Sequence, residues 1–335
     1  MNALRKYDIK DIVIGGDKDC KLHEFALHDT KLGHKNRQGK GSNTLNSGTQ
    51  SHVSVHGKKV GKQWFCIHCN AWKGQYGLEP TPSDYVSHTL LWVKEAWRVL
   101  RNDGIMFLNL ADSYAGSNKC QLLIPRRVTI ALVDAGWTLR NTIIWHKPNA
   151  MPESVTDRFS KKYEYIFMFT KRKKYYFNLD AIREPHKEVS TERLKRAVGN
   201  NNKWVNGADG QTKHNLSQPR PNYKDRIGSM QSTEFNGSDY LVGKLNPLGK
   251  NPGDVWVIPT QPSSEKHYAM WPERLVERMV KCSTKAGDIV LDPFCGSGST
   301  LKVAEQLHRK GIGIDLGYHE ISKRRTSKIQ KEMFV

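Results

Sequence analysis

The pattern of apolar and polar residues predicts short strands separated by helices and polar turns. Apolar runs bounded by turn formers predict strands at 105–114, 140–148, 164–170, 252–258 and 289–291. A capped helical pattern covers 77–100, and 300–308 has helical character. Residues 175–178 are expected to pair with 164–170 as a hairpin across the basic turn 171–174. Apart from the strand at 252–258, the regular elements therefore concentrate outside two polar blocks, one near the N-terminus and one over residues 181–258.

The segment after the last apolar run has the most informative chemistry. The run at 289–291 leads into Asp292, and a Gly-Ser-Gly turn follows at 296–298. Glycines there let the backbone turn tightly and approach a ligand. A second short strand at 311–314 ends on Asp315, whose carboxylate can accept hydrogen bonds from ribose hydroxyls. This arrangement is typical of a nucleotide-type site, and a tight corner without a ligand is the alternative.

The motif Asp-Pro-Phe-x-Gly-Ser-Gly at 292–298 resembles the cofactor loop of the DNA amino-methyltransferases, which bind S-adenosylmethionine. The resemblance implies that Asp292 meets the methionine end of the cofactor and that Phe294 packs beside the adenine. A dinucleotide site would instead need G-x-G-x-x-G near the N-terminus, which this chain lacks. The cofactor-binding residues implied by the resemblance are Asp292, Pro293, Phe294, Gly296, Ser297, Gly298 and Asp315.

The resemblance extends over most of the chain, through 77–86, 105–114, 140–148 and 267–275. These segments are similar to permuted members of the family, often encoded by phages and prophages, in which the catalytic half precedes the cofactor half. The implied fold is an α/β, Rossmann-like S-adenosylmethionine-dependent methyltransferase, circularly permuted, with two loop-rich insertions. The implied domains are an N-terminal insertion (1–80), the catalytic half (81–180), a target-recognition region (181–258) and the cofactor-binding half (259–335).

One motif of that family has no counterpart in this sequence. The family carries a polar residue followed by Pro-Pro-Tyr or Pro-Pro-Trp, which holds the target amine and stacks on the extruded base. The 335 residues contain no Pro-Pro dipeptide. The expectations are a late-assigned start, an upstream polypeptide that supplies the motif and its central strand, or a decayed remnant. Asn109 and Asp112 are weak candidates for a catalytic replacement, and a turn or helix cap is the alternative for Asp112.

Cysteine and histidine spacing predicts a structural metal site. Cys20 and His23 form one pair with a two-residue gap, and Cys66 and Cys69 form another. Such a Cys₃His set suits tetrahedral zinc, and four protein ligands leave no position open for catalysis. His28 or His68 could replace a ligand, and a metal-free turn is the alternative.

Composition favours a polyanionic partner. The formal net charge is +20 and the pI about 9.6, although acidic substrates or a membrane surface would also account for the charge. No apolar run is long enough to span a membrane, and no hydrophobic leader is present. Together with the resemblance, which implies double-stranded DNA as the partner, these features lead us to expect a protein of the bacterial or phage-infected cytoplasm.

The resemblance implies methyl transfer to the exocyclic amine of a flipped base, either N4 of cytosine or N6 of adenine. Relatives with this cysteine-bearing insertion favour N4 of cytosine, and a restriction enzyme is an expected partner. The alternative from another class is a non-catalytic, zinc-stapled DNA-binding remnant or subunit of such an enzyme. Methylation of RNA or protein is a third, less favoured reading.

Overall fold

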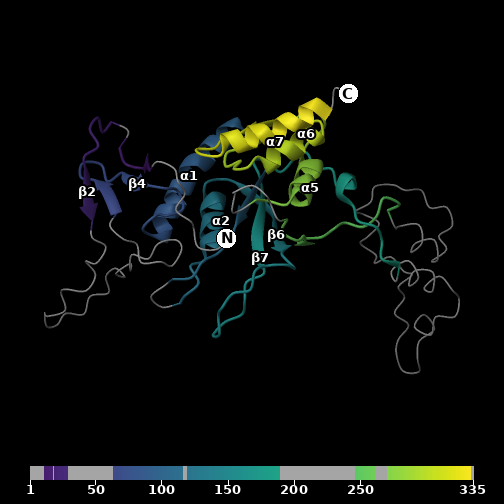
Figure 1. Cartoon of the computed structure of the whole chain (residues 1–335), viewed down its shortest axis with the longest axis horizontal. Helices are drawn as coiled ribbons and strands as arrows, with labels where there is room; N and C mark the ends of the chain where they lie inside the picture. Colours follow the sequence, from purple (N-terminus) through teal and green to yellow (C-terminus); the bar gives the residue numbers. More distant parts are fainter. Residues whose placement is uncertain are drawn as a thin grey trace, which may run out of the picture. The chain divides into compact units, whose positions relative to one another are not determined.

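The computed structural model describes residues 11–17, 19–28, 63–115, 119–188, 246–261 and 270–332 (Figure 1). The chain divides into two compact units: a smaller one, Leu179–Pro252, and a larger one made of Met1–Asn178 and Gly253–Val335. The larger unit contains the glycine turn with its two acids and the four predicted metal ligands.

The larger unit is built on a mixed four-stranded sheet. Its strands are β5 (Ile105–Leu110), β6 (Thr138–His146), β7 (Tyr163–Thr170) and β8 (Val255–Val257), in the order β5-β7-β6-β8. Strand β7 is antiparallel to both neighbours, and β8 is parallel to β6. Strands β5, β6 and β8 therefore run in one direction, and their carboxyl ends share one edge of the sheet.

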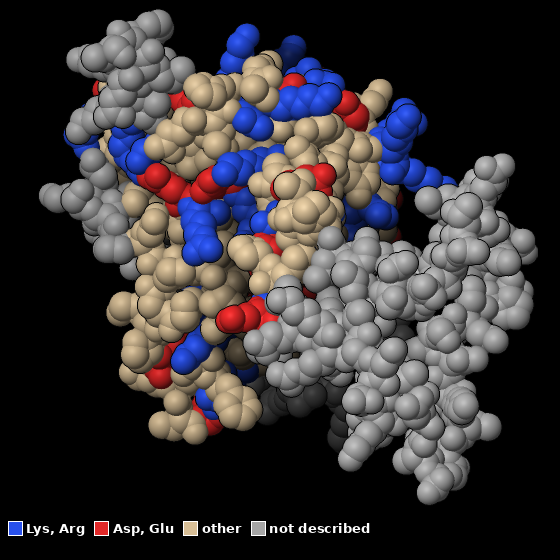
Figure 2. Space-filling view, turned by 90° about the vertical axis from the view of Figure 1, so that its right-hand side faces the viewer, with Lys and Arg blue, Asp and Glu red and all other residues tan. Residues whose placement is uncertain are grey.

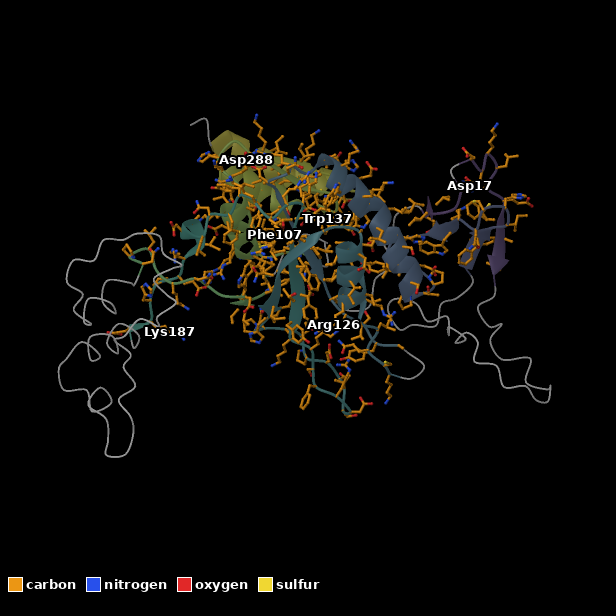
Figure 3. The ribbon with its side chains drawn as sticks, turned by 180° about the vertical axis from the view of Figure 1, so that it is seen from behind. Asp17, Phe107, Arg126, Trp137, Lys187 and Asp288 are labelled. Carbon is orange, nitrogen blue, oxygen red and sulfur yellow. The ribbon has the colours of Figure 1, made fainter. Side chains whose placement is uncertain are left out.

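Two apolar clusters cover the two faces of this sheet. On β7, successive side chains point to opposite faces, so that Ile166 joins one cluster while Phe167 and Phe169 join the other. The first cluster includes α5 (Glu273–Ser283), and the second includes α1 (Pro82–Val99) and α2 (Ile124–Asp134). Phe107 and Trp137, labelled in Figure 3, belong to the first and second clusters respectively.

The last part of the larger unit forms a separate parallel pair of strands. Strands β9 (Ile289–Asp292) and β10 (Lys310–Gly313) are connected through α6 (Ser299–Gln306), and α7 (His319–Glu332) follows. Val303 of α6 and Val280 of α5 lie in the first apolar cluster, which packs this pair onto the unit.

The two sheets are not joined to each other in the described residues. Strand β9 pairs with β10 and β5 pairs with β7, and neither has a strand on its other side in the parts described. Arg101, just before β5, lies 3.3 Å from the carboxylate of Asp288, just before β9. The two strands thus begin near each other, while Ile289 is 61% exposed and Leu291 is 40% exposed. An apolar strand with an unpaired edge is a place where another strand can add.

A small antiparallel sheet precedes α1. Its strands are β1 (Ile12–Ile14), β2 (Phe25–His28), β3 (Gln63–Cys66) and β4 (Trp72–Gly74), in the order β1-β4-β3-β2. The buried Trp72 ring stacks on His88 of α1 at 5.7 Å between centroids. That contact places the small sheet against α1.

Several elements differ from the sequence-based expectations. Tyr175–Asn178 is not a strand, because its amides serve other partners: Tyr176 donates to Asp103 and Asn178 donates to Cys282. Strand β7 instead pairs with β5 and β6, which leaves no edge for a local hairpin. Helix α1 begins five residues later than the predicted start, at Pro82, where the Thr81 hydroxyl accepts a hydrogen bond from the Asp84 amide.

Parts of the predicted elements lie outside the described residues. Of the region 181–258, the structure describes 181–188 and 246–258, and of the segment 267–275 it describes 270–275. Among the helices of the described ranges, none is both long and apolar enough to cross a membrane.

Candidate active site

Two carboxylates meet at the carboxyl ends of β9 and β10. The strands are parallel and Gly313 lies opposite Asp292, so Asp292 and Asp315 reach the same edge. The backbone continues this pairing beyond the strands, because Ile314 donates to the Asp292 carbonyl and Cys295 donates to the Ile314 carbonyl. Ligands of open α/β sheets bind at this edge.

Asp292 is held by the loop it begins. One carboxylate oxygen accepts a hydrogen bond from the Phe294 amide at 3.0 Å, and the other accepts one from the Thr300 hydroxyl at 2.5 Å. Burial raises the pKa of Asp292, and these two hydrogen bonds only partly offset that rise. The negative charge of Asp315 raises the pKa of Asp292 further. A cation bound beside Asp292 would therefore be favoured electrostatically.

Asp315 organises the glycine turn from the neighbouring strand. Its carboxylate accepts hydrogen bonds from the amides of Gly296, Gly317 and Tyr318, at 3.0, 2.8 and 2.6 Å. A carboxylate offers about four lone-pair positions, so room remains for about one further donor. Asp315 could thus receive one ribose hydroxyl while it fixes the turn, whereas two would require an amide to be displaced.

The turn itself is shaped by Gly298 and anchored by α7. Gly298 has φ +80°, and a Cβ there would overlap the hydroxyl of Ser322. Arg325 of α7 donates hydrogen bonds to the carbonyl and the hydroxyl of Ser297, at 2.9 and 2.8 Å. The buried Ser297 is thereby fixed from a helix that lies later in the chain.

Phe294 lies against an aromatic group formed by Tyr76 and by Trp92 of α1. Its ring stacks on Tyr76 at 5.7 Å between centroids, and Trp92 meets it edge-on at 5.1 Å. The Tyr76 hydroxyl is fixed by Thr89 at 2.6 Å and by the Trp92 indole at 3.0 Å. Phe294 remains 54% exposed, which leaves part of the ring open to a planar ligand.

The two weak catalytic candidates are engaged in structural contacts. The Asp112 carboxylate accepts hydrogen bonds from the Ser113 amide at 2.9 Å and from the Ile124 amide, at the start of α2, at 3.0 Å. The Asn109 side chain donates to the Tyr165 carbonyl at 2.9 Å and accepts from the Trp271 indole at 3.0 Å. Asp112 therefore acts as a cap for α2, and Asn109 connects β5 with β7 and the segment before α5.

The four predicted metal ligands come together in the small sheet. Cys20, His23, Cys66 and Cys69 place their ligand atoms within 4.8 Å of one another. The Cys20 and Cys66 sulfurs are 3.9 Å apart, and the Cys69 sulfur is 3.4 Å from His23 Nδ1. His68 lies outside the group and contacts Glu24 at 3.4 Å.

The turn between Cys66 and Cys69 has the backbone of a tight knuckle. The Asn70 amide donates to the Cys66 carbonyl at 2.9 Å, and Asn70 has φ +58°. Gly16 packs so closely that a Cβ would lie 2.8 Å from the Cys69 sulfur. The sheet is therefore built around the four side chains.

Sequence reasoning missed the residues that support the cofactor loop from a distance. Thr300 stands in the first turn of α6, and the helical spacing from the loop could have pointed to it. Arg325, Tyr76 and Trp92 gave no local signal, because tertiary packing brings them to the loop.

A parallel strand pair that ends in two acids, joined by a glycine turn and a helix, has the geometry of a nucleotide-type site in an α/β fold. The chain belongs to the DNA methylase family, since the family profile for N6 and N4 methyltransferases, described as DNA methylase, matches residues 40–324. Members of this family transfer a methyl group from S-adenosylmethionine to exocyclic amines of DNA.

Characterised relatives agree with this assignment. The chain is 30% identical to the type II methyltransferase M.SfiI of Streptomyces fimbriatus, over 73% of this chain and 79% of that protein. It is 30% identical to M.Cfr9I of Citrobacter freundii, over 72% of this chain and 70% of that protein. The fold also matches the solved PvuII DNA methyltransferase, described as cytosine-N4-specific, with a TM-score of 0.51, 18% identity and coverage of 77% of this chain and 78% of that one.

Proposed function

We propose that this chain is a site-specific methyltransferase that holds S-adenosylmethionine at the ends of β9 and β10. The observation that carries the proposal is the pair of acids, Asp292 and Asp315, held on one glycine turn beside the exposed ring of Phe294. The cofactor supplies an electrophilic methyl group on a sulfonium. The chain's own residues bind and orient it, and Pro293, Gly296, Ser297 and Gly298 complete the loop.

Each part of the cofactor has a residue of matching chemistry. Asp292 carries the charge that suits the ammonium of the methionine end. The free part of the Phe294 ring suits the adenine, since Tyr76 and Trp92 hold that ring rigidly from behind. The remaining lone-pair position of Asp315 suits a ribose hydroxyl. These assignments use separate residues and can be tested one at a time.

The amine acceptor belongs to a segment that we propose lies in an upstream polypeptide. Its Pro-Pro-aromatic motif would follow a strand that fills the place between β5 and β9, whose facing edges have no described strand partner. Both strands begin near the Arg101–Asp288 ion pair. A parallel strand between them would therefore deliver its following loop to the edge that holds Asp292. This order of parts is the circularly permuted one typical of phage and prophage enzymes.

Target recognition is proposed for residues 181–258, and the bacterial or phage-infected cytoplasm is the proposed location. Asn, Gln and Arg in this interval can read base edges, while Lys and Arg contact phosphates. The target amine is proposed to be N4 of cytosine, which the resemblance to relatives with the cysteine-bearing insertion favours, with N6 of adenine as the alternative. A restriction enzyme that cleaves the same site is the proposed biological partner.

Zinc is proposed as a structural ligand of the small sheet. With Zn–S bonds of about 2.3 Å, the sulfurs of a tetrahedral site lie about 3.8 Å apart. The distance of 3.9 Å between the Cys20 and Cys66 sulfurs agrees with this sulfur–sulfur distance. Zinc at this site would hold β1, β2 and β3 together, and with four protein ligands it would take no part in catalysis.

The alternative function is a non-catalytic DNA-binding subunit or remnant that keeps the zinc site. The structural contacts of Asn109 and Asp112 favour it, because a capping and a bridging role account for these two side chains without catalysis.

Transfer of labelled methyl groups from S-adenosylmethionine to DNA distinguishes these functions. We expect little transfer by the chain alone and substantial transfer when the upstream segment is co-expressed with it. The Asp292→Ala variant of the reconstituted enzyme should be inactive. Reconstituted protein that binds the cofactor and DNA without transferring methyl groups would favour the non-catalytic alternative.

A further inference from the structure

The loop between β6 and β7, residues 147–162, presents an aromatic side chain entirely to solvent. Phe159 is 96% exposed, the greatest exposure among the large apolar residues that the structure describes as exposed. The loop is the teal segment that extends below β7 in Figure 1. A phenylalanine exposed in this way contributes nothing to the core, and its apolar ring is available to a partner.

The loop is braced, so that Phe159 is held outward by its neighbours. At its base, the Asn149 side chain exchanges two hydrogen bonds with the backbone of Thr260, at 2.9 and 2.8 Å. Near its tip, Glu153 accepts a hydrogen bond from Arg158 at 2.5 Å and one from the Lys161 amide at 3.4 Å. Although burial raises the pKa of Glu153, the Arg158 hydrogen bond lowers it below its usual value, so the brace is ionised at neutral pH.

A second set of contacts connects the tip to the loop that follows β5. The Arg158 guanidinium lies over the Tyr114 ring at 4.2 Å, and Asp157 pairs with Lys119 at 2.5 Å. The Lys161 ammonium donates a hydrogen bond to the Asp112 carbonyl. Both residues that flank Phe159 on its N-terminal side are therefore fixed, and the ring between these anchored points has no packing partner of its own in the described residues.

The position of the loop matches that of a DNA-contacting element. Because β5 and β6 run in the same direction, the loop lies at the carboxyl edge of the main sheet. Arg126 at the start of α2 lies at this end of the sheet in Figure 3, whereas Asp288 lies at the opposite end. The loop has four basic and two acidic residues, and Lys162, three residues after Phe159, is exposed.

We propose that Phe159 is a wedge that enters the base stack of duplex DNA and fills the space left by the extruded target base. The inference rests on the proposed function, since it requires DNA that is opened for chemistry on a base. Extrusion leaves unstacked neighbours, and an apolar ring inserted there restores stacking on one or both sides. Lys162 and Arg126 can meet the flanking phosphates, while the brace keeps the ring from folding back.

The test compares binding of two short duplexes, one intact and one with a single abasic position. The abasic duplex offers the space without the cost of extrusion, so its use does not depend on the recognition sequence. The full chain should bind the abasic duplex about tenfold more tightly, because stacking of a base on one aromatic side chain is worth about that factor or more. The Phe159→Ala variant should lose this preference, and Phe159→Trp should keep it.

Met151→Ala is the matched control, because Met151 is a 77% exposed apolar residue of the same loop without a ring. It should keep the preference for the abasic duplex. A 2-aminopurine next to the abasic position should lose fluorescence with the parent chain and with Phe159→Trp, but not with Phe159→Ala. Both truncated side chains are exposed, so thermal unfolding should be unchanged.

Two other results of the binding experiment would overturn the proposed wedge, and they differ in what they imply for the action on DNA. DNA binding by the parent chain without a preference, or a preference that survives in Phe159→Ala, overturns the wedge and leaves the methyltransferase assignment standing. No binding to either duplex at low salt overturns the wedge together with the proposed action on DNA.

Discussion

At the scale of single residues, the cofactor loop combines a buried carboxylate with a site for a cation. Asp292 has only a hydroxyl and an amide as partners, its pKa is raised by burial, and Asp315 adds a second negative charge nearby. A positively charged ligand would compensate this unfavourable arrangement. In the free protein the two negative charges are therefore electrostatically unfavourable, and binding of a cationic ligand would relieve this.

The pH dependence of cofactor affinity tests this interpretation of Asp292. The cationic cofactor favours the ionised carboxylate, so affinity should rise with pH as the free protein's Asp292 loses its proton, above the ordinary aspartate pKa of about 3.9. Asp292→Asn should bind about a hundredfold more weakly, as expected for one partner of a buried charge pair, and its affinity should lose this part of the pH dependence. Calorimetric titrations of both proteins across the pH range provide the measurement.

The same substitution makes an opposite prediction for stability without the cofactor. A carboxyl whose folded pKa is raised stabilises the folded chain only while it is protonated, and this contribution is lost as pH rises through that pKa. Asp292→Asn should therefore unfold at a temperature no lower than the parent at neutral pH. A marked drop in its unfolding temperature would mean that Asp292 is primarily structural.

Local spacing was sufficient to identify only part of the site. Asp292, Gly298 and Asp315 follow directly from the order strand, turn, helix and strand, which the sequence states within a short interval. Arg325 and Trp92 come from distant helices and become part of the site only through packing. The four cysteine and histidine positions were predictable because two-residue gaps fix each pair locally, and the antiparallel pairing of β2 with β3 then brings the pairs together.

At the scale of elements, the start of α6 depends on close approach to α7. Gly298 and Gly287 both have positive φ, +80° and +84°, but only Gly298 lies against another element. Alanine at either position should cost about 1 kcal/mol or more in backbone strain. Gly298→Ala should cost additional free energy of unfolding because of Ser322, and it should weaken cofactor binding.

Denaturant unfolding of the two alanine variants measures the difference directly. Ser322→Gly combined with Gly298→Ala should recover part of the additional loss, since it removes the hydroxyl and Cβ of Ser322, two of the three atoms nearest to the new Cβ. Equal unfolding free energies for Gly298→Ala and Gly287→Ala would show that the close approach has no energetic importance.

The small sheet makes a separate prediction about metal. We expect one zinc ion per chain, and Cys69→Ser should remove most of it, since three remaining ligands hold zinc far less tightly. Cys120→Ser is the matched control, because Cys120 is exposed and lies outside the cluster. Metal analysis of the purified proteins decides the question, and a metal-free parent chain purified without chelators would contradict the prediction.

Sequence patterns predicted an element best where the residues of that element alone, without its partners in the fold, indicate its structure. Strand β7 was found because its apolar run is buried on both faces, and β9 because it leads into the glycine turn. The prediction of a strand at Tyr175–Asn178 was wrong because there the tertiary pairing, and not the local sequence, decides the structure. Those residues are aromatic enough for a strand, but β7 already pairs on both edges, and their amides bond to Asp103 and Cys282 instead.

At the scale of the whole molecule, the positive charge favours binding to DNA, and the edges of β5 and β9 that are unpaired among the described residues favour the addition of a strand. The net charge of +20 is distributed, and Figure 2 shows Lys and Arg side chains spread over the face it presents, with acidic residues among them. A distributed positive charge raises affinity for DNA without selecting a sequence. Specificity must then come from base-reading residues and from the shape of the site.

These edges of β5 and β9, which have no described strand partner, imply different requirements for cofactor binding and for catalysis. Among the described residues, the hydrogen-bond donors to Asp292 and Asp315 come from the glycine turn, the start of α6 and the segment after β10. Cofactor binding should therefore survive without an added strand, although methyl transfer should require one. Because of this separation, cofactor binding tests the loop at Asp292 more directly than methyl transfer does.

Calorimetric titration of the purified chain with S-adenosylmethionine, beside the Asp292→Ala variant, is that measurement. We expect the parent chain to bind the cofactor in the micromolar range, with one site per chain, and the variant to remain folded but lose this binding. A folded parent chain that does not bind the cofactor would contradict the assignment of the loop at Asp292 as a working cofactor site.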